Sequence, residues 1–117
     1  MTAIVYGIKQ CDTVKKALAW LDLHGVDYSF HDYKKSGVPG DRLDIWADLL
    51  GWEPLANTRG TTWRKIPEGE RTALDRPKML ALLKSYPSAI RRPVVEWREG
   101  VLTLGFDPKA FSQALDQ

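Results

Sequence analysis

The first part of the chain changes from an apolar run to a helical pattern around residue 11. Ile4–Ile8 is mainly apolar, and polar residues then follow as far as Thr13. Beyond them, apolar residues recur at intervals of three and four, which places them on one face of a helix. This face consists of Val14, Ala17, Leu18 and Leu21. The pattern predicts a short strand, a loop, and a helix that begins at Cys11.

A second strand is predicted where the pattern begins to alternate. Gly25 supplies the left-handed residue that commonly ends a helix. In Val26–His31, apolar and polar residues alternate, as they do in a half-buried strand. Strand, helix and strand at this spacing form a βαβ unit, so we expect the two strands to be parallel. Lys34–Gly40 has turn chemistry and marks a boundary.

The middle of the chain, about residues 40–88, returns to helical spacing. Asp41 is predicted to cap a helix that Gly51 ends, and Asp75 to cap a second helix with proline in its first turn. Between them lie the polar loop Asn57–Thr62 and a short helical turn at Trp63–Ile66. The inward positions are predicted to be Leu43, Trp46, Ala47 and Leu50 in the first helix, and Met79, Leu82, Leu83 and Tyr86 in the second. We therefore predict a helical insertion.

Extended structure returns near the end of the chain. Val94–Trp97 and Val101–Leu104 flank the turn Arg98–Gly100 and are predicted to form a β-hairpin. Asp107 then caps a last helix, with Pro108 at its first position. Its face toward the sheet is predicted to contain Phe111, Ala114 and Leu115. The complete order is β-α-β, helices, β-β-α, which is that of an α/β protein.

Composition narrows the class of protein. The chain has 117 residues, of which 44% are apolar and 27% charged, so we expect one globular domain. The net charge of +2 is too small for a nucleic-acid footprint, and Lys34–Lys35 and Arg91–Arg92 are interpreted as solvated pairs. No apolar run approaches a membrane span, and the N-terminus lacks a signal-peptide pattern. We expect a cytoplasmic protein with no nucleic-acid or membrane partner.

The single cysteine, Cys11, is the strongest candidate for chemistry. The first N–H groups of a helix have no partner within the helix and carry the positive end of its dipole, so they favour a thiolate. Lys9 adds positive charge nearby, as do Lys15 and Lys16 if they fold back. A thiolate is the nucleophilic form of cysteine. The alternative is that Cys11 is only a small buried apolar residue.

The two histidines offer little by themselves. Cys11, His24 and His31 have no metal-ligand spacing, so we expect no metal site. Neither histidine has a carboxylate or a second ligand at a meaningful spacing, and both are interpreted as surface or packing residues. Glycine-rich phosphate-binding loops are also missing from the sequence. We expect no bound cofactor.

Three segments resemble one family over the whole length of the chain. They are Tyr6–Ala17, Asn57–Arg64 and Ile90–Val94, and their spacing fits as well. The sequence resembles the ArsC/Spx family, and within it the YffB-like branch. The resemblance implies a thioredoxin-like fold with a mixed four-stranded sheet. It also implies that Cys11 is the redox cysteine, that Arg92 lies near it, and that Pro93 is the cis-proline of such proteins.

Departures from the family pattern limit what the resemblance implies. In the arsenate reductases three arginines surround the thiolate. Arg92 matches one of these, Arg59 is close to a second, and the position of the third falls near Gly105. Losing one cation weakens binding of a dianion. Spx regulators have a second cysteine three residues after the first, and Val14 occupies that position, so a CxxC switch is impossible.

The leading hypothesis is a glutathione-dependent thiol–disulfide reductase with one catalytic cysteine. Glutathione would be a co-substrate that resolves the mixed disulfide, since no internal thiol can. Cys11 and Arg92 are the predicted catalytic residues, and Lys9, Thr13, Arg59 and Pro93 the predicted substrate-binding residues. The alternatives are an arsenate reductase coupled to glutaredoxin, and a non-catalytic Spx-like regulator that binds RNA polymerase. We expect a monomer that acts on a disulfide or an oxyanion.

Overall fold

The computed structural model describes residues 2–116, and the chain divides into two compact units. One unit joins the chain up to Ser36 with the chain from Arg92 onward, and the other spans Gly37–Arg91. The elements of the first unit are β1 Ala3–Gly7, α1 Asp12–Leu23, β2 Tyr28–Asp32, α2 Tyr33–Ser36, β3 Val94–Arg98, β4 Val101–Leu104 and α6 Pro108–Asp116.

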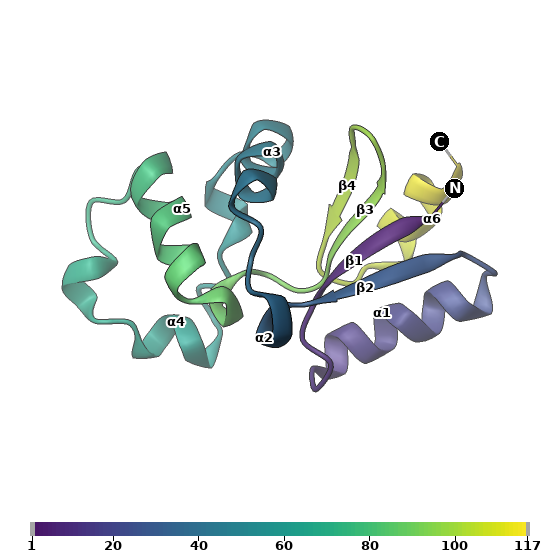
Figure 1. The fold of residues 1–117 in the computed structure, drawn as a ribbon, viewed down its shortest axis with the longest axis horizontal. Helices are drawn as coiled ribbons and strands as arrows, with labels where there is room; N and C mark the ends of the chain where they lie inside the picture. Colours follow the sequence, from purple (N-terminus) through teal and green to yellow (C-terminus); the bar gives the residue numbers. More distant parts are fainter. Residues whose placement is uncertain (1, 117) are drawn as a thin grey trace. The chain divides into compact units, whose positions relative to one another are not determined.

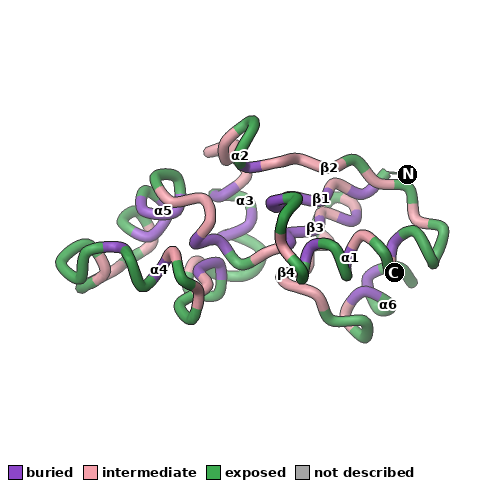
Figure 2. Tube along the Cα trace, turned by 90° about the horizontal axis from the view of Figure 1, so that it is seen from below, coloured by how far each residue is buried: buried purple, intermediate pink, exposed green. Residues whose placement is uncertain are grey.

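The first unit is built on a mixed four-stranded sheet, as expected. The strand order is β2-β1-β3-β4. β1 and β2 are parallel, with Gly7 opposite Asp32, whereas β3 is antiparallel to β1, with Tyr6 opposite Val94. The central strands β1 and β3 are largely buried, and the edge strands β2 and β4 are only partly covered (Figure 2). The prediction of parallel strands in the βαβ unit is therefore confirmed.

The two long helices of this unit, α1 and α6, pack against the same face of the sheet (Figure 1). The core between them contains Ala3, Val5, Ala17, Leu21, Val95, Trp97, Phe111 and Ala114. Phe111 is its centre, because the rings of Trp20 and Trp97 meet it edge-on with centroids 5.3 and 5.1 Å away. Leu115 was expected to face the sheet and is instead 38% exposed, because the neighbouring Phe111 and Ala114 already fill the apolar stripe of α6.

The second unit contains only helices and turns. Its elements are α3 Gly40–Leu50, the 3₁₀ turn Glu53–Leu55, α4 Thr61–Lys65, the 3₁₀ turn Glu68–Glu70, α5 Arg76–Ser85 and the 3₁₀ turn Pro87–Ala89. Within it, Arg76 ties α5 to α3 by a 2.7 Å ion pair with Asp48 and a hydrogen bond to the carbonyl of Asp44. This unit supplies the helices that the sequence predicts between the second and third strands.

Three details of the sequence prediction are corrected. Asp41 does not cap α3: the cap position is Pro39, and Asp41 lies in the first helical turn. Leu50 was placed on the inner face of α3 and is 37% exposed, since the helix ends at Gly51 before that turn can be covered. The segment that begins at Lys34 was interpreted as a turn, but Tyr33–Ser36 forms the short helix α2.

The architecture is the thioredoxin-like fold that the resemblance implies. β1-α1-β2 is followed by the short helix α2, then by the helices of the second unit, and then by β3-β4-α6. Among the described residues, no helix combines the length and the hydropathy that crossing a membrane requires. Our prediction that residues 1–117 form a single domain stays a prediction.

Candidate active site at the start of α1

Cys11 lies where the sequence places it, at the beginning of α1. It is the cap residue, with extended backbone angles of φ −124° and ψ 123°, and its carbonyl accepts the first helical hydrogen bond from Lys15 N–H at 2.9 Å. The side chain is a free thiol that is half-buried. The interpretation of Cys11 as a buried apolar residue therefore does not describe this position.

A close approach between strand and helix holds this position. Gly7 ends β1, and a Cβ on it would lie 3.0 Å from Cγ2 of Val14 in the first turn of α1. Val14 itself is fully buried. The missing side chain at Gly7 thus lets α1 start directly against the end of β1. The loop between them delivers the sulfur of Cys11 to the carboxyl end of that strand.

The surroundings of the sulfur favour its ionised form. Partial burial by itself would raise the pKa of Cys11, but the Val14 N–H, the Arg92 guanidinium and the Thr13 N–H lower it by more. The net pKa of Cys11 is therefore below the usual value of a thiol. The helix N-terminus acts as the sequence predicts, because Thr13 and Val14 supply two of the N–H groups that have no partner inside α1.

Among the described residues, Arg92 is the cation that acts on Cys11. Its side chain donates a hydrogen bond to the sulfur and adds a favourable charge interaction, both of which lower the pKa of Cys11. The lysines expected to help, Lys9, Lys15 and Lys16, are exposed and take no part in this shift. Their long side chains remain hydrated, whereas Arg92 is fixed beside the thiol by its place before β3.

Arg92 is followed by a cis peptide bond to Pro93, as the resemblance implies. Pro93 is buried, and its carbonyl accepts a hydrogen bond from Gly105 N–H at 2.9 Å. Gly105, near the position of the third arginine of the arsenate reductases, has φ 73°. This left-handed conformation strains other residues, so the backbone as well as the sequence disfavours an arginine there. The substrate-binding role of Pro93 stays a prediction.

The remaining predicted site residues divide between the two units. Lys9 and Thr13 are exposed next to Cys11 in the sequence, and Thr13 contributes its backbone N–H. Arg59 belongs to the other unit, in a tight turn where its N–H donates to Oδ1 of Asn57 at 3.3 Å. Its side chain is exposed. Substrate binding by Lys9, Thr13 and Arg59 stays a prediction from the resemblance.

Both histidines have packing roles in the structure. His24 donates from Nδ1 to the carbonyl of Trp20 at 2.8 Å and stacks on its indole ring, with centroids 3.7 Å apart. His31 packs between Tyr6 and Tyr33, with ring centroids 5.2 and 6.1 Å away. Over residues 2–116, no three side chains of the metal-ligating types form a group that could hold an ion.

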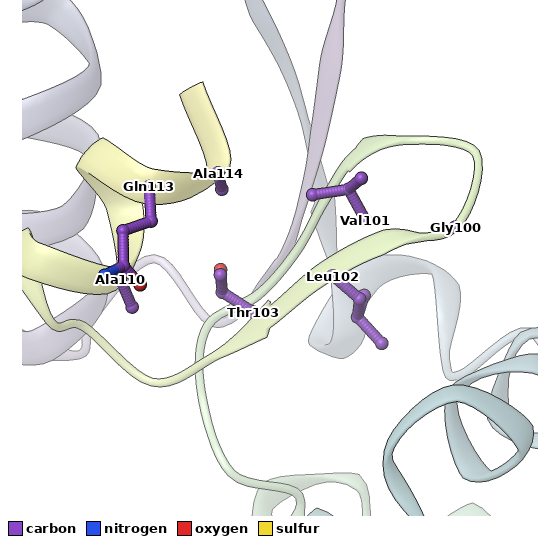
Figure 3. Close-up of a pocket in the computed structure, with 7 residues that line it drawn as sticks. All are labelled: Gly100, Val101, Leu102, Thr103, Ala110, Gln113 and Ala114. Carbon is purple, nitrogen blue, oxygen red and sulfur yellow. The ribbon is translucent and has the colours of Figure 1, made fainter. Parts of the chain in front are cut away.

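One surface hollow of the first unit lies away from this chemistry. It has a volume of about 330 Å³ and lies between β4 and α6, lined by Gly100, Val101, Leu102, Thr103, Ala110, Gln113 and Ala114 (Figure 3). The β3–β4 turn beside it is at the opposite end of β3 from Pro93. Its lining residues include no cysteine, histidine or charged side chain, so the hollow is not the candidate active site.

The fold and the site together define a thioredoxin-like protein with one cysteine of lowered pKa at a helix N-terminus. The chain belongs to the ArsC family, whose sequence signature matches residues 6–114. It is 40% identical over 110 residues to an uncharacterised protein of Haemophilus influenzae, covering 94% of this chain and 96% of the relative. It is also 28% identical over 87 residues to the global transcriptional regulator Spx of Streptococcus pneumoniae, covering 73% of this chain and 65% of the regulator.

Solved structures agree with this assignment. The YffB protein is 45% identical, with a TM-score of 0.92 over 97% of this chain and 98% of its own. An arsenate reductase related protein from Brucella melitensis is 44% identical, with a TM-score of 0.75 over 100% and 97% of the two chains. The arsenate reductase of Vibrio cholerae is 20% identical with a TM-score of 0.79 over 99% and 97%, and shows a likeness of fold.

Sequence reasoning missed a polar group on the face of the sheet opposite α1 and α6. Tyr6 donates its hydroxyl to Oε1 of Glu96 at 3.0 Å across the β1–β3 pair. Tyr33, just beyond β2, is affected by the charges of Arg92 and Glu96 and by Tyr6. A signal was available in the alternation of β1 and β3, because Tyr6 and Glu96 are the polar residues at positions pointing away from the apolar core.

Proposed function

We propose that the protein is a thiol–disulfide oxidoreductase that uses Cys11 as its single redox cysteine and glutathione as co-substrate. The observation that carries this proposal is the set of donors around the sulfur: two helix N–H groups and the Arg92 guanidinium, which together lower the pKa of Cys11. A thiolate at neutral pH is what attack on a disulfide requires.

The reaction would proceed in two exchanges. The substrate is a disulfide between glutathione and a substrate thiol. The Cys11 thiolate attacks the glutathione sulfur of this disulfide, forms a mixed disulfide with glutathione, and releases the substrate as a thiolate. A second glutathione thiolate then attacks the glutathione sulfur of this mixed disulfide. Oxidised glutathione leaves, and Cys11 returns to its thiolate form. The chain has no second cysteine, so the resolving thiol must come from outside.

Arg92 would contribute at both ends of this cycle. In the resting protein it stabilises the thiolate of Cys11 through a hydrogen bond and its charge. Once the sulfur is in a disulfide and uncharged, its charge interaction with the guanidinium is lost. A glutathione carboxylate is a suitable replacement, because arginine binds carboxylates through two parallel N–H groups.

Mass spectrometry after incubation with oxidised glutathione tests the proposal. We expect a glutathione adduct on the wild-type protein, none on Cys11→Ser, and slower formation on Arg92→Ala. Arg91→Ala is the matched control, because Arg91 is the exposed neighbour of Arg92 and belongs to the other unit. A wild-type protein that remains unmodified under conditions where free cysteine reacts would refute the proposal.

Arsenate reduction is the second candidate, and the arsenate reductase related protein of Brucella melitensis favours it at 44% identity. Against it, the position near the third arginine is occupied by Gly105 with φ 73°. Arsenate-dependent consumption of glutathione in the presence of glutaredoxin would support this candidate. The likeness to Spx suggests a regulator that binds RNA polymerase, for which Cys11→Ser would keep full activity.

A further inference from the structure

The most unusual side chain outside the proposed mechanism is Tyr33, the first residue of α2. It follows directly on β2, whose last residue, Asp32, lies opposite Gly7 at the end of β1. Val94, at the start of β3, lies opposite Tyr6. The ends of β1 and β2 and the start of β3 therefore meet at one end of the sheet, where α2 and the first turn of α1 are both found (Figure 1). Tyr33 thus shares this end with Cys11 and Arg92.

The hydroxyl of Tyr33 is buried without a partner. The residue is 3% exposed, and its hydroxyl has no hydrogen-bond partner among the described residues. The contrast with Tyr6 is clear, since the hydroxyl of Tyr6 donates to Glu96 at 3.0 Å. Burial raises the pKa of Tyr33 far above its usual range, and Tyr6 and Glu96 raise it further, while Arg92 lowers it. Tyr33 therefore keeps its proton and remains a hydrogen-bond donor throughout the working pH range.

A buried donor without an acceptor destabilises the folded state and is rare in native proteins. A phenylalanine at the same position would keep the ring contact with His31, whose centroid is 6.1 Å away, and would avoid the unsatisfied hydroxyl. The hydroxyl is therefore better explained by an acceptor that arrives from outside the chain. An acceptor beside the Arg92 guanidinium is favoured if it is negatively charged.

We propose that Tyr33 is a substrate-binding residue, and that its hydroxyl and the Arg92 guanidinium together donate to one anionic oxygen of the molecule that reacts at Cys11. The oxygen belongs to a carboxylate or another oxyanion. This proposal rests on the thiol chemistry proposed for Cys11, but it does not require that the substrate be glutathione. It predicts that the site selects reagents with a negative charge close to the reacting atom.

Two alkylating reagents test this selectivity. Iodoacetate and iodoacetamide are both attacked by the Cys11 thiolate at the carbon that bears the iodine, and both release iodide. They differ in one group, which is a carboxylate in iodoacetate and a neutral amide in iodoacetamide. We take the rate of alkylation by iodoacetate over that by iodoacetamide and divide it by the same ratio for free cysteine. A change in the thiolate fraction of Cys11, or in its accessibility to reagents, affects both rates equally and leaves this normalised ratio unchanged. In Tyr33→Phe we expect this ratio to fall about tenfold, the size of effect of one hydrogen bond to a charged group.

Tyr28→Phe is the matched control. Tyr28 also lies on β2, and its hydroxyl interacts with Asp22 rather than with the site. We expect the control to keep the wild-type ratio. We also expect the melting temperature of Tyr33→Phe to equal or exceed that of the wild type. An unchanged ratio in Tyr33→Phe would overturn the proposal. An unchanged ratio is also the result expected if an ordered water already accepts the hydrogen bond of the Tyr33 hydroxyl. Equal slowing of both reagents would overturn it as well.

A measurement on the wild-type protein covers the case in which Tyr33→Phe does not fold. Alkylation with the two reagents leaves either a carboxylate or an amide on Cys11. We expect the carboxymethylated protein to have the higher melting temperature, and equal or reversed values would contradict the proposal. Neither experiment involves glutathione. A wild type that forms no glutathione adduct but shows Tyr33-dependent selectivity would refute the proposed function alone.

Discussion

The helices α1 and α5 have cap residues of the same backbone conformation, but the N–H groups at their N-termini have different effects. α1 starts after Cys11 and α5 starts after Asp75, and both cap residues have extended backbone angles. The Asp75 carboxylate accepts a hydrogen bond from Lys78 N–H at 3.0 Å. The Cys11 side chain makes no capping hydrogen bond of ordinary length, yet the N–H groups of Thr13 and Val14 still lower its pKa.

The difference shows that the type of cap residue decides whether the N–H groups of a helix N-terminus contribute to stability or to reactivity. An aspartate is ionised at neutral pH in any case, so the donors of α5 mainly fix the helix end. A cysteine is neutral until its surroundings favour the thiolate, so the same kind of donors at α1 change the chemical state of the residue. The further difference is Arg92, which adds its hydrogen bond and charge at α1.

Removal of Arg92 is expected to have the largest effect on this comparison. In Arg92→Ala the pKa of Cys11 rises toward that of a free thiol, because a hydrogen bond and a positive charge are lost. We expect the rate of alkylation at pH 7 to fall about tenfold or more. Titration of the ultraviolet absorbance of the thiolate measures the pKa directly. Arg91→Ala should behave as the wild type, and an Arg92→Ala protein with an unshifted titration would show that the helix alone activates Cys11.

Gly7→Ala tests whether the position of α1 matters. The new Cβ would lie 3.0 Å from Val14 Cγ2, so the first turn of α1 must move or the strand must shift. We expect destabilisation by about 1–3 kcal/mol, measured by denaturant unfolding, together with slower alkylation of Cys11. Gly69→Ala is the control, because a Cβ there meets nothing within 4 Å. A variant that loses stability but keeps the alkylation rate would show that the packing of α1 against β1 does not determine the reactivity of Cys11.

Asp75→Ala tests the expectation that the cap of α5 affects stability but not the reactivity of Cys11. The variant leaves Lys78 N–H without its capping acceptor, and we expect it to lower the free energy of unfolding by about 1 kcal/mol. Asp75→Asn should retain most of the stability, since its amide oxygen can accept the same hydrogen bond. The alkylation rate of Cys11 should remain unchanged in both variants. A change in that rate would mean that the two helix ends are not independent.

The smallest expected effect is a dependence of stability on pH through Cys11. The folded state has the lower pKa, and the unfolded thiol has a value of about 8.5. Folding therefore gains stability from the thiolate above the unfolded pKa, and this gain is lost as the pH falls through the folded pKa. We expect the stability difference between wild type and Cys11→Ser to increase with pH. A difference that is constant with pH would show that folding does not favour the thiolate.

The sequence alone determined the elements and the reactive position. Periodicity, caps and turns are local, so the start of α1 at Cys11, the cap at Asp75 and the hairpin of β3 and β4 could all be read from neighbouring residues. Local rules failed where a helix end has several suitable residues, as at Pro39 and Asp41. The choice there depends on backbone angles that residue preferences do not fix.

Only the tertiary structure decided which groups act on the sulfur. The nearby lysines in the sequence take no part in the pKa shift of Cys11, whereas its cation is Arg92, eighty-one positions away (92 minus 11). The family resemblance implied that Arg92 lies near Cys11, but the local pattern of residues could not find it. Tyr33 was missed for the same reason, since strand pairing brings it to the same end of the sheet. Charge interactions depend on distance in space and on exclusion of water, and both are set by how strands pair rather than by separation along the chain.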